Sequence, residues 1–208
     1  PAFRFYKWVI HTKNVIRKSF RDGYIAFSGM LRCMGLCRTE NSKLLYSYKN
    51  KHKGQRCFLV GNGPSMRLSD LEGLQKNGEI TFGCNLVTKA FDQTTWRPDY
   101  YFLIDRICAK FQSEEINEAI GDIPLFTNIT TYNIFREKPK NPVILYNIAK
   151  DKYKVKRSPL AYYIPSGSTV MSLMIEMAVY MGFSEIYLIG CDCTSTFTGN
   201  THFINGYT

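Results

Sequence analysis

Residues 56–66 read RCFLVGNGPSM, and this stretch decides the fold. The apolar run from Cys57 to Val60 ends at a turn of small residues, 61–65, and SDLEGL at 69–74 begins a helix. A short apolar strand that leads through a glycine-containing turn into a helix is typical of a parallel sheet. The stretch therefore predicts the first βα unit of an α/β domain.

Further units of the same kind follow along the chain. The predicted strands are residues 80–83, 100–104, 124–127, 143–146 and 186–189, and the longest predicted helices are residues 107–120 and 168–181. In the second helix, apolar side chains recur at spacings of three and four, the pattern of a helix packed on a core. Short apolar strands that alternate with helices indicate a sheet covered on both faces. We predict an α/β fold, a Rossmann-like mostly parallel sheet with flanking helices.

The positive charge of the chain is confined to its beginning. Residues 1–56 contain 13 Lys or Arg and two acidic residues, whereas residues 57–208 contain 14 Lys or Arg and 15 acidic residues. Apolar residues alternate with the basic ones, so we expect a basic helical arm over residues 1–52 and the Rossmann-like domain over residues 53–208. The nearly neutral domain argues against nucleic acid as a partner.

No membrane-spanning helix or secretory signal is expected. The richest apolar segment, 170–187, is interrupted by serine and glutamate, and basic residues interrupt any signal sequence near the beginning. The chain starts with Pro1 instead of methionine, so we expect a trimmed sequence. We also expect a cytoplasmic protein. The arm also contains Phe3, Trp8 and Phe20, which suits peripheral binding to the anionic inner face of a membrane. A solvated helix face or a homo-oligomer contact is the alternative.

The seven cysteines do not form a metal-binding pattern. No CxxC occurs, and no cysteine pair lies near a spaced pair of histidines. Several cysteines lie in or beside apolar runs, where a reduced thiol packs as a small apolar side chain. We therefore expect reduced core thiols and no metal ligands.

Small and polar residues follow several predicted strands. In parallel sheets the carboxyl ends of the strands meet at one edge, where ligands bind. Small residues there let backbone N–H groups approach an anion, and asparagine side chains offer both donors and acceptors. The candidate residues at this edge are Asn62, Gly63, Pro64, Ser65, Asn85, Asp105 and Asp192.

Asp105 and Asp192 each allow two interpretations. Carboxylates at strand ends can hold Mg²⁺ between substrate phosphates. Alternatively, Asp105 caps the following helix and Asp192 accepts backbone N–H groups in a turn.

Several of these blocks together resemble a known family. Residues 56–66, 82–85, 165–167, 181–192 and 200–204 are similar, in order, to the bacterial sialyltransferases of glycosyltransferase family 42. The same blocks resemble a broader domain family named for archaeal 6-hydroxymethylpterin diphosphokinases, which is common in bacterial surface-polysaccharide loci. WRPDYY at 96–101 fits this broader family better.

The sialyltransferase resemblance implies a glycosyltransferase that moves a sugar from a CMP-linked nucleotide-sugar to a surface glycan or glycolipid. It makes residues 53–208 a nucleotide-binding catalytic domain with no cofactor besides this donor. It implies that Asn62, Gly63 and Asn85 hold the nucleotide and that Ser166 and Gly167 line the same cleft. His202 would be the general base that removes the acceptor proton.

The resemblance leaves other functions open. Those sialyltransferases continue with a further helix and strand, so we expect that this sequence is truncated after Thr208. The broader family suggests a Mg²⁺-dependent and ATP-dependent diphosphokinase instead. A non-catalytic nucleotide-binding module of a polysaccharide assembly system is the third interpretation.

Overall fold

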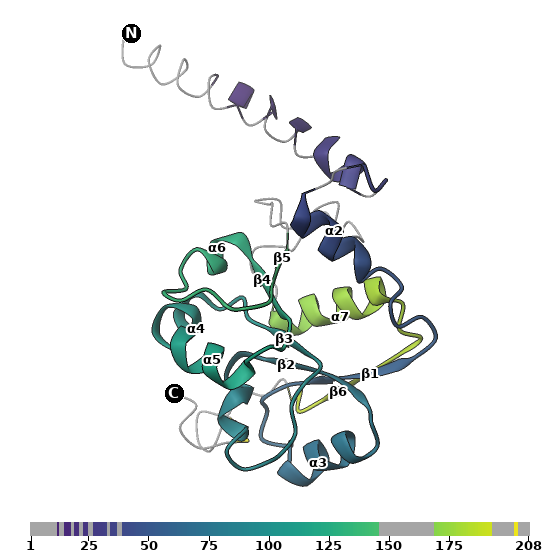
Figure 1. The fold of residues 1–208 in the computed structure, drawn as a ribbon, viewed down its shortest axis with the longest axis vertical. Helices are drawn as coiled ribbons and strands as arrows, with labels where there is room; N and C mark the ends of the chain where they lie inside the picture. Colours follow the sequence, from purple (N-terminus) through teal and green to yellow (C-terminus); the bar gives the residue numbers. More distant parts are fainter. Residues whose placement is uncertain are drawn as a thin grey trace.

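The computed structural model describes residues 39–145, 169–192, 202 and 203, together with part of the segment 12–36. Within these residues six strands form one parallel sheet in the order β5-β4-β3-β2-β1-β6 (Figure 1). The strands are β1 (Arg56–Val60), β2 (Ile80–Cys84), β3 (Tyr100–Phe102), β4 (Leu125–Asn128), β5 (Pro142–Leu145) and β6 (Glu185–Ile189). The predicted α/β fold with a parallel sheet is confirmed.

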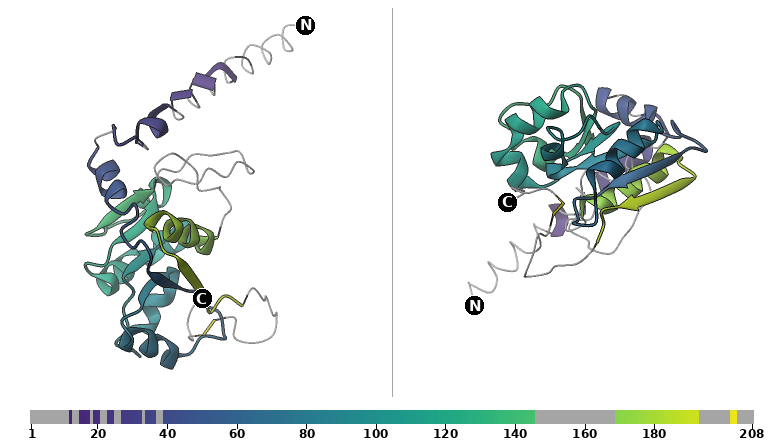
Figure 2. Two further views of the ribbon diagram at one scale, coloured as in Figure 1. Left: turned by 90° about the vertical axis from the view of Figure 1, so that its right-hand side faces the viewer. Right: turned by 90° about the horizontal axis from the view of Figure 1, so that it is seen from below.

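Helices cover both faces of this sheet (Figure 1, Figure 2). One face packs against α2 and α7, and the other packs against the helical segments that follow β1, β2 and β3. The helical elements are α2 (Glu40–Ser47), α3 (Leu68–Lys76), the 3₁₀ helix η1 (Asn85–Ala90), α4 (Arg106–Phe111), α5 (Ser113–Ile120), α6 (Ile129–Tyr132) and α7 (Val170–Met181). The two apolar layers are what keep these short strands together.

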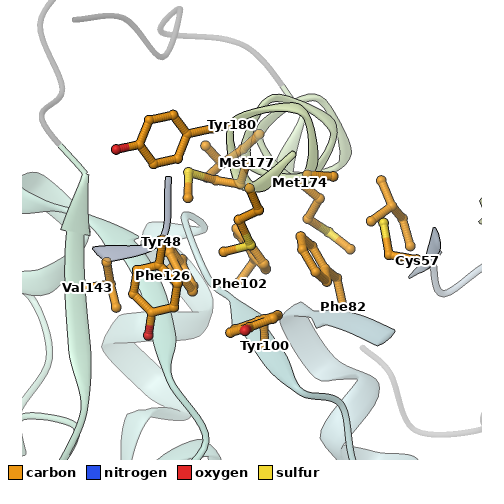
Figure 3. Close-up of a cluster of buried hydrophobic side chains, with 14 of the residues drawn as sticks. Tyr48, Cys57, Phe82, Tyr100, Phe102, Phe126, Val143, Met174, Met177 and Tyr180 are labelled. Atoms are coloured by element: carbon orange, nitrogen blue, oxygen red, sulfur yellow. The ribbon is translucent and has the colours of Figure 1, made fainter. Parts of the chain in front are cut away.

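The core under α7 is built from aromatic rings and methionines (Figure 3). Phe82, Phe102 and Phe126 come from three neighbouring strands and stack on one another, with ring centroids 5.2 and 4.8 Å apart. Met174 and Met177 of α7 are fully buried above them. Flexible thioether side chains fill the irregular space over the stacked rings, which fixes α7 on this face.

Two details differ from the sequence prediction. The predicted helix 107–120 is two helices, because Gln112 has φ −128° and ψ 15° and interrupts the helical backbone. The last strand, β6, is half-exposed rather than covered, with Leu188 47% exposed. In the described part of the chain β6 pairs only with β1 and forms the edge of the sheet. No described strand pairs with its other side, and its surface is therefore more exposed than that of an inner strand.

The strand order reverses direction at β1. From β1 the chain adds β2, β3, β4 and β5 on one side, and β6 returns to the other side of β1. In open parallel sheets this reversal separates the loops that leave two adjacent strands, and ligands bind between them. In this sheet the reversal point lies between the ends of β1 and β6.

Helix α2 packs on the α/β body although it precedes β1. Asn41 donates from Nδ2 to the carbonyl of Ile144 (2.7 Å) and accepts the N–H of the same residue (2.9 Å). The Tyr180 hydroxyl of α7 donates to the carbonyl of Leu45, which is fully buried. Residues from Thr39 onward thus pack on the body. The arm boundary at residue 52 stays a prediction, because the preceding residues 1–38 are described only in part.

The described residues between Thr12 and Arg32 are helical, as expected for an arm. Phe20, Tyr24 and Phe27 expose 78, 73 and 57% of their surfaces. Among the residues that the structure describes, no helix has the length and apolar character that crossing a membrane requires.

The packing of α2 can be tested with two neighbouring leucines. We expect Leu45→Ala to lower the free energy of unfolding by about 2–5 kcal/mol, because it leaves a cavity beneath α2. Leu44 is 38% exposed, so Leu44→Ala is the matched control and costs less than about 1 kcal/mol. Urea unfolding followed by circular dichroism measures both. Equal effects of the two substitutions would contradict the packing of α2 on the body.

Candidate functional site

The loops that follow β1 and β6 approach each other through their backbones. Gly61 donates its N–H to the carbonyl of Ile189 and Gly63 donates to the carbonyl of Gly190, both at 2.8 Å. A Cβ atom on Gly61 would lie 2.3 Å from the Gly190 carbonyl oxygen, and one on Gly63 would lie 2.0 Å from Asp192 Oδ2. Glycine is required at both positions because no side chain fits between the loops. We call this arrangement the inter-loop contact.

Asp192 closes the inter-loop contact. Its Oδ2 accepts the backbone N–H of Ser65 at 3.1 Å, across 127 residues of sequence. The hydroxyl and N–H of Ser65 hold the pKa of the Asp192 carboxyl below its ordinary value. The stabilising bond is therefore present above the ordinary pKa of a free carboxyl and is lost as the pH falls through the lowered one. Of the two interpretations from the sequence, acceptance of a backbone N–H is the one observed.

The two candidate asparagines lie side by side at the ends of β1 and β2. Asn62 donates from Nδ2 to the carbonyl of Cys84 at 3.2 Å. Cys84 is the residue immediately before Asn85. Asn85 has a left-handed backbone, with φ 51°, and its carbonyl accepts the hydroxyl of Tyr101. The Oδ1 atoms of both asparagines are buried and have no partner among the described residues. Each is an acceptor suited to an N–H or O–H donor.

A hollow of about 510 Å³ opens beside the inter-loop contact, at the reversal point of the sheet. Its described lining is Ser65, Met66, Asp70 and residues 188–192. It therefore combines an apolar wall from β6 with the carboxylates of Asp70 and Asp192, and none of the described lining residues is basic. We call it the acidic hollow.

Both carboxylates of the acidic hollow are oriented by backbone N–H groups. Asp70 Oδ2 accepts the N–H of Arg67 at 3.1 Å, which forms the capping box of α3. Asp192 is held by Ser65 as described above. The Ser65 hydroxyl also interacts with the Asp192 carboxylate. The acidic hollow thus has two carboxylates in its described lining, each held by a backbone N–H group of a nearby residue.

The backbone N–H groups of the loop are used within the protein. The N–H groups of Gly61, Gly63 and Ser65 donate to the residues named above, and Met66 donates to the carbonyl of Gly63 at 3.1 Å. Pro64 has no N–H to offer. The expected anion cradle of backbone N–H groups is thus occupied at four of the loop positions by protein contacts, and the ligand-facing chemistry falls to side chains.

Asp105 lies apart from this site and caps a helix. Its Oδ1 accepts the N–H groups of Ile107 and Cys108, at 2.7 and 3.2 Å. The capping interpretation is therefore the one that the structure supports. Among the described residues, no group of three or more His, Cys, Asp or Glu side chains could hold a metal ion. A cation in the acidic hollow would thus need oxygen ligands from a substrate.

The cysteines near the site are poor nucleophiles. The four cysteines within the described residues are reduced. Burial raises the pKa of Cys84 to about 12 and that of Cys57 to about 12. Both thiols are therefore protonated at neutral pH, and neither supplies the thiolate that covalent catalysis requires.

His202 lies beside the loop that follows β1. Its Nδ1 is 3.4 Å from the Asn62 carbonyl oxygen, and the next residue, Phe203, donates its N–H to the same oxygen at 3.3 Å. The structure thus brings His202 to the candidate site, at the end of β1. Ser166 and Gly167 lie outside the described residues.

Sequence reasoning missed Asp70. In the sequence it belongs to the start of a predicted helix, where an acidic residue is explained by capping. Its place in the acidic hollow depends on how α3 turns back toward β6, a contact made across more than 100 residues. Its position six residues after Pro64, in the first turn of the helix that follows the strand-end loop, was the available signal.

The parallel sheet with helices on both faces is a Rossmann-like α/β arrangement, and a polar hollow lies at its reversal point. A family model described as "6-hydroxymethylpterin diphosphokinase MptE-like" matches residues 37–197, most of the chain, and the chain belongs to this family. The resemblance to the broader family is confirmed, and the sialyltransferase assignment stays a prediction. Searches of curated proteins and of solved structures found no match.

The inter-loop contact can be tested with a pair of glycines. We expect Gly61→Ala to lower the free energy of unfolding by about 1–3 kcal/mol, because the new methyl group collides with the Gly190 backbone. Gly73 lies within α3 with nothing within 4 Å of its would-be Cβ. Gly73→Ala is the control and should stabilise by roughly 0.5–1 kcal/mol. Urea unfolding decides, and a neutral Gly61→Ala would refute the close approach.

Proposed function

We propose that this chain is a Mg²⁺-dependent transferase that moves a pyrophosphate group from ATP to a hydroxyl group of a small acceptor. The family description supports diphosphokinase chemistry, and the inter-loop contact supports a ligand position between the ends of β1 and β6. The observation that carries the proposal is that Asp70 and Asp192 both line the acidic hollow.

The charge of the acidic hollow explains why a cation belongs in this reaction. The described lining of the hollow holds two carboxylates and no basic residue, and such a lining repels a triphosphate. Mg²⁺ prefers oxygen ligands and is usually held by one or two carboxylates together with substrate phosphates. The carboxylates of Asp70 and Asp192 fit that ligand set. When bound, the cation would neutralise charge that develops on the transferring phosphates.

The remaining residues would bind and orient the substrates. The buried Oδ1 atoms of Asn62 and Asn85 are acceptors for the N–H or O–H groups of a base, ribose or pterin ring. In the transfer, the acceptor oxygen bonds to the β-phosphorus of ATP while the bond from that phosphorus to the α,β-bridging oxygen breaks. AMP leaves with the electron pair, and the hydroxyl proton passes to water. The inter-loop contact keeps Asp192 in place during this exchange.

Glycosyl transfer is the second candidate, and the position of His202 favours it. His202 lies next to Asn62, where a base could remove a proton from an acceptor hydroxyl. In that reaction the acceptor oxygen bonds to the anomeric carbon of a CMP-linked sugar, and CMP leaves. No carboxylate-bound cation is needed, so the two candidates differ in their dependence on Mg²⁺.

The first test removes one charge from the acidic hollow. We expect Asp192→Asn to slow AMP release from ATP with 6-hydroxymethylpterin as acceptor by roughly 10²–10³-fold, because one ligand of the cation is lost. The amide oxygen still accepts the Ser65 N–H, so the fold is preserved. Asp122→Asn is the matched control, because Asp122 is exposed and pairs with Lys140.

The same assay separates the candidates. Removal of Mg²⁺ with EDTA should abolish AMP release by the wild type. If turnover instead requires a CMP-sugar, persists in EDTA and falls roughly 10²–10⁴-fold in His202→Ala, glycosyl transfer replaces the diphosphokinase proposal. Nucleotide binding without turnover of either donor would favour the non-catalytic module.

The proposal places the arm on an anionic membrane surface. Residues 1–56 carry the whole positive excess, and the helical Phe20, Tyr24 and Phe27 are exposed at spacings of four and three, on one side of a helix. Basic charge beside an apolar stripe is the composition of helices that lie in the membrane interface.

Vesicle co-sedimentation tests the arm. Vesicles with phosphatidylglycerol should bind the full chain, and binding should fall with added salt because the attraction is electrostatic. The triple variant Phe20→Ser, Tyr24→Ser, Phe27→Ser should lose most of this binding. Val179→Ser, an exposed position on α7, is the control. Equal binding to neutral phosphatidylcholine vesicles would contradict the electrostatic part.

A further inference from the structure

A second hollow, of about 730 Å³, lies between α4 and the residues that follow α6. The described residues that line it are Arg106, Ile107, Lys110, Phe111, Ile134 and Arg136. Helices α4 and α6 pack on each other and begin near the carboxyl ends of β3 and β4. The hollow therefore belongs to the ligand-binding edge of the sheet, on the opposite side of β2 from the acidic hollow. We call it the basic hollow.

The cations of the basic hollow have no acidic counterpart within it. Arg106, Lys110 and Arg136 are exposed, and the described lining contains no Asp or Glu. The ion pairs of the described residues are formed elsewhere, by Lys43, Arg56 and Lys140. The adjacent carboxylate, Asp105, is not part of the described lining and caps α4 through Oδ1. Three cations converge here in a domain whose own charge is close to zero.

Apolar side chains complete the basic hollow. Ile107 and Phe111 are four residues apart on α4, so they lie on one side of the helix, and they are 71 and 68% exposed. The Lys110 ammonium lies 5.0 Å from the centroid of the Phe111 ring. The charged groups thus stand directly beside an exposed apolar surface, which a ligand could cover.

We infer that the basic hollow binds a phosphate or pyrophosphate group that carries an apolar substituent. The arginine guanidinium groups offer paired donors that match phosphate oxygens, and Lys110 adds a point charge. Ile107 and Phe111 would cover the apolar part of the ligand. This ligand needs no bridging cation, in contrast to a phosphate in the acidic hollow. The inference rests on these residues and is independent of the proposed transfer reaction.

Titration calorimetry with monomeric octyl phosphate tests this site in the full-length chain. The wild type should bind it, and Arg106→Gln with Arg136→Gln should weaken binding by roughly tenfold or more, because two phosphate contacts are lost. Ile107→Ser with Phe111→Ser should remove the advantage of octyl phosphate over methyl phosphate. Lys76→Gln, an exposed position on α3, is the control and should bind as the wild type does.

An uncharged probe and a chelator complete the experiment. Octyl glucoside should not bind, and EDTA should leave the binding of octyl phosphate unchanged. Equal affinity of the wild type and the arginine double variant, with both folded by circular dichroism, would overturn the inference. So would binding of octyl glucoside with the affinity of octyl phosphate.

Whether the natural ligand is a lipid headgroup or a soluble phosphate can be tested by comparing a phosphate embedded in vesicles with phosphates in solution. If the natural ligand is a lipid headgroup, the wild type should bind dihexadecyl phosphate in phosphatidylcholine vesicles more tightly than the arginine double variant does. If it is a soluble phosphate, the two proteins should bind the vesicles equally, and inorganic pyrophosphate should compete with octyl phosphate.

Discussion

The close approach of the backbone at Gly61 and Gly63 to Gly190 is the constraint on which the site depends. It continues the β1–β6 pairing beyond the ends of both strands and leaves no room for a side chain between the loops. Because the loops touch there, Asp192 reaches the Ser65 N–H, and α3 starts where Asp70 can share a hollow with Asp192. A side chain at Gly63 would collide with the Asp192 carboxylate itself, and one at Gly61 would collide with the Gly190 backbone.

The carboxyl edge of the sheet carries two hollows of opposite charge. The acidic hollow stands where the strand order reverses, and the basic hollow stands beyond β2 at the ends of β3 and β4. Neighbouring strands are about 4.8 Å apart, so the hollows are on the order of 10–15 Å apart along the edge. One edge therefore offers phosphate-bearing ligands two distinct environments, one that needs a cation and one that supplies its own positive charge.

The fold could be predicted because its signals are local. Each strand is a short apolar run that ends at small or polar residues, and α7 shows its buried face through apolar spacings of three and four. Part of the site was predictable, because Asn62, Asn85 and Asp192 lie within three residues of a strand end. Asp70 was not, since its capping role hides a contact with the distant β6 loop. The break at Gln112 and the exposure of β6 also depend on tertiary packing, which no local pattern reports.

The polar groups at the ends of β1 and β2 are held in an unfavourable state by the core beneath them. Two buried amide oxygens without a partner among the described residues cost about 1–3 kcal/mol each, and the left-handed backbone of Asn85 adds strain. The stacked rings of Phe82, Phe102 and Phe126 offset that cost, because they fix β2, β3 and β4 against α7 whatever the strand ends require. The two amide oxygens are already desolvated in the folded protein. A ligand that donates hydrogen bonds to Asn62 and Asn85 would therefore bind without a further desolvation cost at these atoms and without moving the sheet.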